Sequence, residues 1–354
     1  MSSPPEVLLP ATRIAVAERE QLAIIDPSGS LTPERLPDDP LFETARKAAE
    51  FMQAAKAPAT HRAYDSDWRH FAAWCEQHHL VSLPALPATV ALYLTELAHP
   101  PAGERPRKAA TITRRLTAIN AAHKAKGLDS PATMNHRVVA ATFHGIRRTL
   151  GIAQARKKPL TRERIVKVLD SLEGPIAAAR DKALLLIGFA GALRRSELAA
   201  MRFEHLHWGK RGLTIQIPRS KTDQEGAGRT VEMLWGASER TCPILALQNW
   251  LQAAGIKSGP VFRRVSQYGT IGRAMHPDSI GRRVKELVRR ANLANPKEYG
   301  GHSLRAGFVT EASANGATND QIMKQTGHTT DAMVRRYARG DREDKLAAQS
   351  KLGL

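Results

Sequence analysis

Apolar side chains recur with a helical period through the first half of the chain. From Phe42 to Thr149 they return every three or four positions, and proline, glycine or serine interrupts them at intervals typical of short helices. The pattern predicts helices over 41–55, 60–79, 87–98, 107–126 and 131–149. Such a series indicates a helical bundle, and its core is expected to include Trp68, Phe71, Trp74 and Tyr93.

The pattern changes after residue 151. The segment Ile152–Leu160 interrupts the helical period with two lysines and a proline, which is typical of a linker between domains. Two further helices are predicted over 161–172 and 178–191. Two alternating segments, 212–218 and 228–234, then predict strands joined by the loop SKTDQEGAG, and the remaining pattern is helical. We therefore expect a mainly α protein of two domains, the second of them mixed, with one small antiparallel sheet.

These boundaries divide the chain into five parts. The first 40 residues are rich in proline, serine and acidic side chains and have no sustained period, so we expect them to be disordered or flexible. The parts are an N-terminal segment (1–40), a helical domain (41–151), a linker (152–160), a second domain (161–341) and a C-terminal tail (342–354).

Charge is distributed unevenly along the chain. The formal net charge is +19, yet residues 1–45 hold three basic and eight acidic side chains, so the remainder carries +24. A field of that sign favours a polyanion, and release of counterions from nucleic acid gives the largest available gain in free energy. The longest apolar run, Ala183–Leu193, is too short to cross a bilayer, and the first residues lack the features of a signal peptide. Two distant cysteines, Cys75 and Cys242, make no disulfide framework. We expect a cytoplasmic DNA-binding protein without membrane association.

Six side chains in the second domain form a candidate set for chemistry on DNA. Each has an ordinary explanation by itself: Arg194 and Glu197, for example, stand three apart on a predicted helix and would form a surface ion pair. Together, two arginines, two histidines, a lysine and a tyrosine supply what metal-free phosphodiester chemistry needs, namely charge neutralisation, proton transfer and a nucleophile. The set is Arg194, Lys221, His302, Arg305, His328 and Tyr337.

The placement of His328 depends on a turn. Nine residues separate His328 from Tyr337, which would put them on opposite faces of one continuous helix. If both residues serve one site, the chain must turn at Gly327 and begin a new helix near Thr329 or Thr330.

Four motifs carry a resemblance to a known family. They are LRRSEL, SKT, GHSLR and TGHTTDAMVRRY, and they occur in this order. The spacings are 27 residues from Arg194 to Lys221, 3 from His302 to Arg305 and 9 from His328 to Tyr337. In order and spacing the series resembles the tyrosine recombinase (phage integrase) family, and WRHFAAWCEQHHLVSLPALPATVALYLTEL resembles its Cre-like branch. The resemblance covers residues 41–354. It implies a helical SAM-like core-binding bundle followed by a mostly α catalytic domain with a small antiparallel sheet.

The resemblance also implies how the scissile phosphate is held. Arg194 and Arg305 would clamp it, and His328 would form a hydrogen bond with it. Glu197 would hold these side chains in place without contacting the phosphate itself.

The remaining roles concern the reaction itself. By the same resemblance Tyr337 would be the nucleophile and would form a 3′-phosphotyrosyl intermediate. Lys221 would protonate the 5′-hydroxyl leaving group, and His302 would assist proton transfer. No metal or cofactor is implied.

Charge and helix position predict DNA contacts in both domains, at Arg114 and Arg115 and at Arg282 and Arg283. By resemblance, the partner is double-stranded DNA with an inverted-repeat site. Two protomers would bind each site and four would assemble on two sites. Strand exchange would pass through a Holliday junction, for integration, excision or resolution of DNA elements. The tail, 342–354, would either dock into a neighbouring protomer or fray.

Two other functions fit part of the pattern. A type IB topoisomerase uses a similar residue set to relax supercoils without choosing a site. A sequence-specific DNA-binding protein would have kept the fold without the chemistry. The helical bundle and compact size favour a recombinase over the topoisomerase, and the presence of all six reactive residues argues against the non-catalytic protein.

Overall fold

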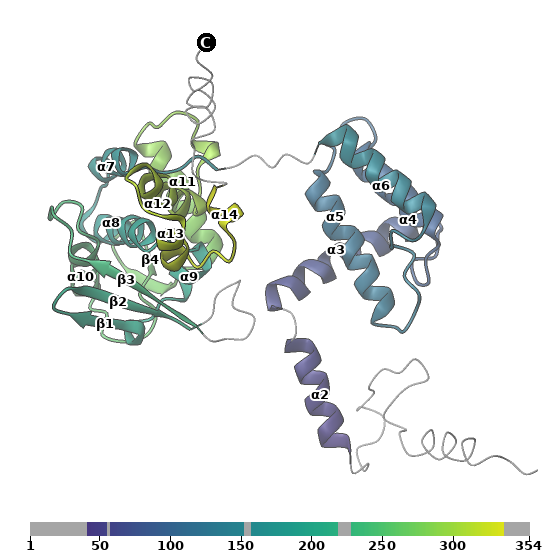
Figure 1. Cartoon of the computed structure of the whole chain (residues 1–354), viewed down its shortest axis with the longest axis horizontal. Coiled ribbons are helices and arrows are strands. Elements are labelled where there is room, and N and C mark those ends of the chain that lie inside the picture. Colours follow the sequence, from purple (N-terminus) through teal and green to yellow (C-terminus); the bar gives the residue numbers. More distant parts are fainter. Residues whose placement is uncertain (1–40, 55–56, 152–156, 219–227, 336–354) are drawn as a thin grey trace, which may run out of the picture. The chain divides into compact units, whose positions relative to one another are not determined.

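The structure is a computed structural model that describes residues 41–54, 57–151, 157–218 and 228–335. The chain divides into two compact units, Met1–Gln154 and Ala155–Leu354. In Figure 1 the first unit runs from purple to teal and the second from teal to yellow. Helices dominate both units, and the strands of the described residues lie in the second, which confirms the mainly α class with small antiparallel sheets.

The first unit is a bundle of helices. Proline occupies the first turn of two of them, where its fixed φ and missing N–H suit a helix start. Phe71, Trp74 and Tyr93 lie in the core, with Trp68 packed at its edge, which confirms the predicted aromatic core. The described helices are α2 (Phe42–Ala54), α3 (Pro58–Gln77), α4 (Pro87–Ala98), α5 (Ala109–Lys124) and α6 (Arg137–Leu150). Helix α3 packs against α5, and α4 packs against α6.

Helix α6 begins six residues later than predicted. The sequence Ser130–Pro131 has the character of a helix start, but the Ser130 hydroxyl accepts a hydrogen bond from the Ala132 N–H and closes a local turn instead. Residues 131–136 form turns, and the helix starts at Arg137.

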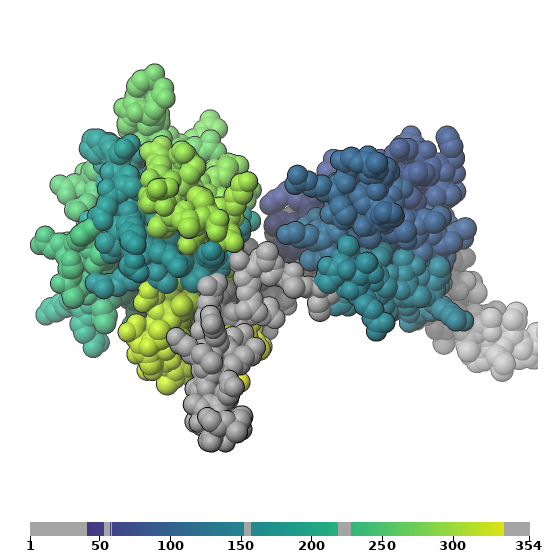
Figure 2. Space-filling model, turned by 90° about the horizontal axis from the view of Figure 1, so that it is seen from above, coloured from purple at the N-terminus to yellow at the C-terminus, as the bar shows by residue number. Residues whose placement is uncertain are grey.

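The second unit is organised around a buried helix. Its helices are α7 (Arg162–Asp170), α8 (Pro175–Ala190), α9 (Arg195–Ala200), α10 (Pro243–Ala253), α11 (Pro277–Arg290), α12 (His302–Ala314), α13 (Asn319–Thr326) and α14 (Asp331–Arg335), with 3₁₀ turns η2 (Phe203–His205) and η3 (Pro296–Glu298). Residues 183–188 of α8 are all buried, and α8 packs against α10 and α12. On the surface, teal segments lie beside yellow-green ones, because early and late parts of this unit fold together (Figure 2).

None of the helices in the described part of the chain is long and apolar enough to span a membrane.

The strands form two small antiparallel sheets. The first has the order β1 (Leu206–Gly209), β2 (Gly212–Ile217) and β3 (Arg229–Leu234), and the second pairs β4 (Arg263–Val265) with β5 (Ile271–Ala274). Strands β2 and β3 confirm the two that were predicted. The expectation of helix from residue 235 onward was wrong at β4 and β5, because strands of three and four residues are too short to give a recognisable alternation.

The end of the predicted linker is bonded to the second unit. The Leu160 N–H donates to the Ser303 carbonyl at 2.9 Å, and Leu160 is fully buried. A Cβ atom on Gly307 would lie 2.1 Å from the Leu160 carbonyl oxygen, so glycine is required for this close approach. Leu160 is therefore fixed to α12, the helix that begins with His302.

Candidate active site

Arg194 and Glu197 are joined at the start of α9. Arg194 directly precedes the helix, and Glu197 lies in its first turn. The Glu197 carboxylate accepts from the Arg194 backbone N–H at 2.9 Å and from its Nη1 at 2.7 Å. The carboxylate therefore satisfies a backbone N–H that the helix leaves unpaired and also fixes the guanidinium. The Glu197 side chain is 1% exposed, so this is a buried ion pair and not the surface pair expected of two isolated residues.

The turn between α8 and α9 brings the second arginine to the first. Ala192 has a left-handed backbone, with φ 47°, and its carbonyl accepts a hydrogen bond from Arg305 Nη1 at 2.9 Å. Arg305 lies on α12, one turn after His302, and is 1% exposed. The turn that presents Arg194 is therefore the anchor of Arg305.

His328 follows a sharp change in chain direction. Helix α13 ends at Thr326 and is capped by Gly327, which has a left-handed backbone with φ 65°, and α14 begins at Asp331. This confirms the predicted turn at Gly327. The turn places His328 Nδ1 at 2.9 Å from Thr326 Oγ1 and His328 Nε2 at 3.3 Å from Arg305 Nε.

The hydrogen bonds of Thr326 decide which nitrogen of His328 carries the proton. The Thr326 hydroxyl has one hydrogen, which it donates to the Ile322 carbonyl at 2.7 Å. It must therefore accept from His328 Nδ1, which leaves Nε2 as the acceptor of the Arg305 N–H. In this arrangement His328 holds the guanidinium of Arg305, and a hydrogen bond from the ring to a phosphate requires the proton on Nε2 instead.

Both histidines of the candidate set favour the neutral form. Burial, together with the positive charges of Arg305 and Arg194, lowers the pKa of His328 to about 3. Partial desolvation also lowers the pKa of His302, followed by the charges of Arg305, Arg194 and Arg195, although His302 as a whole is exposed to solvent. A neutral imidazole at pH 7 is able to accept a proton.

A third arginine, Arg229, belongs to this cluster and was missed by the sequence analysis. It opens β3, donates from Nη2 to Glu197 Oε2 at 3.0 Å and from Nη1 to the Gln325 carbonyl at 2.9 Å. Glu197 therefore lies between Arg194 and Arg229. The signal available in the sequence was a basic residue at the second position of the predicted strand 228–234, close after the loop that contains Lys221.

The structure brings together most of the predicted set. Arg194 Nη2 lies 3.5 Å from the Gly327 carbonyl oxygen, next to His328 and its partner Arg305. His302 is close enough to both arginines for their charges to lower its pKa. Lys221 and Tyr337 lie outside the described residues.

The arginines predicted to contact DNA in the first unit make internal bonds. Arg114 donates to the two Asp67 carboxylate oxygens at 2.6 and 3.0 Å. Arg115 is buried and donates to the Tyr93 hydroxyl at 3.1 Å. The Arg115 guanidinium thus packs within the bundle. Both residues remain predictions as DNA contacts.

The two arginines predicted on α11 differ from one another. Arg283 donates to one oxygen of Asp181 at 3.0 and 2.5 Å, and Asp181 is fully buried and also bonded to Arg180. Arg282 is exposed and donates to the Ser279 hydroxyl at 3.1 Å. Of this pair, Arg282 has the side chain more available to DNA, and both remain predictions as DNA contacts.

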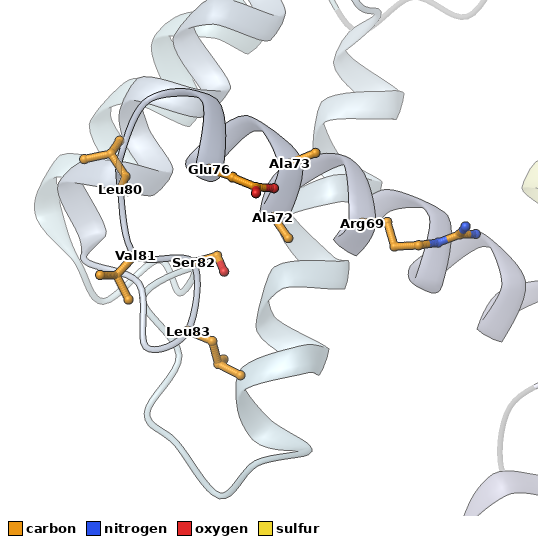
Figure 3. A pocket seen from close by; sticks show the side chains of 8 residues that line it. All are labelled: Arg69, Ala72, Ala73, Glu76, Leu80, Val81, Ser82 and Leu83. Atoms are coloured by element: carbon orange, nitrogen blue, oxygen red, sulfur yellow. The ribbon is translucent and has the colours of Figure 1, made fainter.

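The first unit has a surface hollow of about 620 Å³. Figure 3 shows Leu80, Val81 and Leu83 on the loop after α3, with Arg69 and Glu76 on the helix itself. Its lining contains no histidine or tyrosine, so the hollow does not offer the chemistry of the cluster in the second unit. Within the described ranges, no group of three histidine, cysteine, aspartate or glutamate side chains could hold a metal ion.

Known proteins resemble this chain over most of its length. The integrase/recombinase xerD homolog of Selenomonas ruminantium is 36% identical over 296 residues, which cover 82% of this chain and 84% of the relative. The family described as the phage integrase family matches residues 158–344. The chain belongs to the phage integrase family. Another relative, the recombinase cre of Escherichia phage P1, is 26% identical over 292 residues, which cover 77% of this chain and 81% of the relative.

Solved structures agree on the fold. The Tn1549 transposon integrase, solved in complex with transposon right end DNA, matches 75% of this chain and 84% of its own with a TM-score of 0.51 and 16% identity. As a member of the phage integrase family, the protein is a tyrosine recombinase, an enzyme that cleaves and rejoins DNA in site-specific recombination. Neither the topoisomerase nor the non-catalytic alternative is favoured.

Proposed function

We propose that this recombinase cleaves DNA by attack of Tyr337 on a phosphate held by Arg194 and Arg305. The observation that carries the proposal is the convergence of the two arginines from separate elements. Arg305 is bonded to the Ala192 carbonyl, two residues before Arg194, and the Gly327–His328 turn contacts both guanidinium groups.

The arginines act on the charge of the transition state. As phosphorus becomes five-coordinate, negative charge grows on its two non-bridging oxygens, and guanidinium groups bind such oxygens with two N–H donors. Glu197 fixes Arg194, while Ala192 and His328 fix Arg305. Because these contacts within the protein hold both guanidinium groups in place, little reorganisation is needed when the phosphate enters.

The cleavage step exchanges one phosphate ester for another. The Tyr337 phenolic oxygen forms a bond to phosphorus, and the bond from phosphorus to the 5′ oxygen breaks. The products are a 3′-phosphotyrosyl bond and a free 5′-hydroxyl. Neutral His302 accepts the phenol proton and Lys221 supplies a proton to the 5′ oxygen. Attack by a 5′-hydroxyl of another strand reverses these steps and rejoins the DNA, without an external energy source.

The partners follow from the same proposal. The substrate is double-stranded DNA with an inverted-repeat site, bound by two protomers, and four protomers on two sites exchange strands through a Holliday junction. The tail 342–354, which lies outside the described residues, is a candidate contact between protomers. Removing it would weaken synapsis and leave binding to a single site nearly intact. The cleavage and rejoining steps use side chains of the protein alone. The proposed location is the cytoplasm.

A covalent-adduct assay tests the proposal. A binding site is first selected from a random-sequence duplex library with the full-length protein, and a nicked suicide duplex is then built on that site. The wild type should give a protein–DNA adduct on a denaturing gel, and Tyr337→Phe should give none. Tyr268→Phe, at a tyrosine that is 86% exposed on the second unit, is the matched control and should react like the wild type. An adduct from Tyr337→Phe would show that another residue is the nucleophile.

A second measurement separates recombination from topoisomerase activity. A supercoiled plasmid without the selected site should stay supercoiled with the wild type, whereas a type IB topoisomerase would relax it. Relaxation at a rate equal to that of a plasmid with the site would contradict site-specific recombination.

A further inference from the structure

Arg229 is packed under the turn that presents His328. The Arg229 side chain is 16% exposed, and a Cβ atom on Gly327 would lie 3.2 Å from both its Cδ and its Nε. Glycine at position 327 therefore serves two needs, since the backbone is left-handed there and the arginine fills the space beneath it. The position of the turn depends on what Arg229 contacts.

The guanidinium of Arg229 joins separate segments of the unit. Its Nη1 donates to the Gln325 carbonyl at the end of α13, and its Nη2 donates to Glu197 on α9. The Gln325 side-chain amide in turn donates to the Ala190 and Glu232 carbonyls, both at 3.1 Å. The starts of β3 and α9 and the ends of α8 and α13 are thus linked through two side chains, Arg229 and Gln325.

The charges in this cluster are unequal. The Glu197 carboxylate faces Arg194 with Oε1 and Arg229 with Oε2, at 2.7 and 3.0 Å. One negative charge is therefore shared by two positive charges, and the three groups together carry +1. If residue 229 were neutral, the buried carboxylate would cancel the charge of Arg194 alone, and the pair would offer a phosphate no net charge.

We propose that Arg229 is a positioning residue of the active site. It shares the Glu197 carboxylate, so that Arg194 keeps net positive charge for the scissile phosphate, and it fixes the turn that carries His328. This inference rests on the proposed function, because the charge of Arg194 matters at the phosphate that Tyr337 attacks. Arg229 itself does not touch the reacting atoms.

The test measures single-turnover adduct formation by the full-length protein on two versions of the suicide duplex. One has an ordinary scissile phosphate. The other has a methylphosphonate there, in which a methyl group replaces one non-bridging oxygen and removes the charge. Arg229→Met should slow the reaction on the phosphate by about tenfold or more. On the methylphosphonate it should slow the reaction by less than about threefold, because the uncharged group gains little from arginine.

Two further variants serve as comparisons. Arg229→Lys keeps the charge but lacks the two-pronged donor geometry, so its rate should lie between those of the wild type and Arg229→Met. Arg240→Met breaks an exposed ion pair with Asp170 in the same unit and should stay within about twofold of the wild type on both duplexes.

A double variant gives the sharpest comparison. In Arg229→Met/Glu197→Gln the carboxylate that would cancel the charge of Arg194 is removed, while the amide oxygen still accepts from Arg194. We expect its rate on the phosphate to exceed that of Arg229→Met by several-fold. If Arg229 only supported packing, the second buried substitution would slow the reaction further.

Equal losses on the two duplexes, or a double variant slower than Arg229→Met, would overturn the role of Arg229 while the wild-type adduct still supports cleavage by Tyr337. Absence of a wild-type adduct would overturn the proposed function, and the role of Arg229 with it. Affinity for the uncleaved duplex and the melting temperature are recorded for every variant. A misfolded variant is recognised because its DNA affinity and its melting temperature both fall. If Arg229→Met misfolds, Arg229→Lys is compared with the wild type on the two duplexes in its place.

Discussion

Arg305 donates a hydrogen bond from Nε to Nε2 of His328 at 3.3 Å, so a proposed phosphate ligand and a histidine orient one another. The contact is possible only while Nε2 carries no proton. That condition is met because Thr326 accepts the proton of the other ring nitrogen. The orientation of Arg305 therefore depends, through His328, on the hydroxyl group of Thr326.

Replacing Thr326 tests this dependence. Thr326→Val keeps the shape of the side chain but removes the acceptor for His328 Nδ1, so the ring should populate both tautomers and adduct formation should slow. We also expect the free energy of unfolding to fall by about 1 kcal/mol, the usual worth of a hydrogen bond. The nitrogen chemical shifts of His328 report the tautomer directly, and Thr326→Ser should behave as the wild type. A single Nδ1–H tautomer in Thr326→Val would contradict the assignment.

Stability should depend on pH through His328. Its pKa is about 3 in the folded protein and about 6.5 in an unfolded chain, so the unfolded state binds the extra proton between these values. The free energy of unfolding should therefore fall as pH drops below 6.5, by up to about 1.4 kcal/mol per pH unit from this group. Denaturant unfolding at pH 7.5, 6.0 and 5.0 measures the slope. The slope should be shallower in His328→Gln, and identical slopes in the two proteins would refute the assignment.

Gly307 should tolerate no side chain. In Gly307→Ala the new Cβ would meet the Leu160 carbonyl at 2.1 Å, and both groups belong to backbone that cannot move cheaply. We expect a loss of about 1–3 kcal/mol in the free energy of unfolding, as for other overpacked sites. Gly145→Ala is the matched control on helix α6, where a Cβ meets nothing within 4 Å, and it should gain up to about 1 kcal/mol from helix propensity. A Gly307→Ala protein as stable as the wild type would show that α12 can shift away from Leu160.

Neighbouring arginines on α11 should respond differently to mutation. Arg282→Gln should weaken DNA binding and reduce the slope of log K against log salt by about 1, because an exposed guanidinium would contact a phosphate. Arg283→Gln should instead reduce the free energy of unfolding by about 1–3 kcal/mol, since it leaves buried Asp181 with Arg180 as its remaining arginine partner. Salt-dependent affinity and denaturant unfolding of both variants provide the comparison. If Arg283→Gln reduced the salt slope as much as Arg282→Gln does, and left the free energy of unfolding unchanged, Arg283 would be a DNA contact instead.

Local features of the structure were predictable from sequence. The turn at Gly327 could be predicted on the condition that His328 and Tyr337 serve one site, because nine residues would place them on opposite faces of one straight helix. Strands β2 and β3 alternate clearly enough to be recognised on both sides of their loop. The helical class follows from the period of the apolar positions. The apolar side chains of α8 and of the aromatic core are buried in the structure, as that period predicts.

Relations between distant positions were not predictable. The role of Arg229 depends on contacts with Glu197 and Gln325, which lie 32 and 96 positions away. Arg283 has the pattern of a surface residue on a basic helix, but its partner Asp181 lies 102 positions earlier. Periodicity records which face of an element is buried, and it does not record which charge on another element lies opposite.

The bond between Leu160 and Ser303 has a practical consequence for exchanging recognition modules between enzymes of this kind. The Lys158 N–H likewise donates to the Glu298 carbonyl at 2.9 Å, so the chain is tied to the catalytic unit before its first helix. In a chimera spliced after residue 160, the donor N–H groups of both hydrogen bonds would come from foreign backbone. A junction placed before Lys157 would keep the catalytic half intact, and foreign DNA-binding halves should be grafted there.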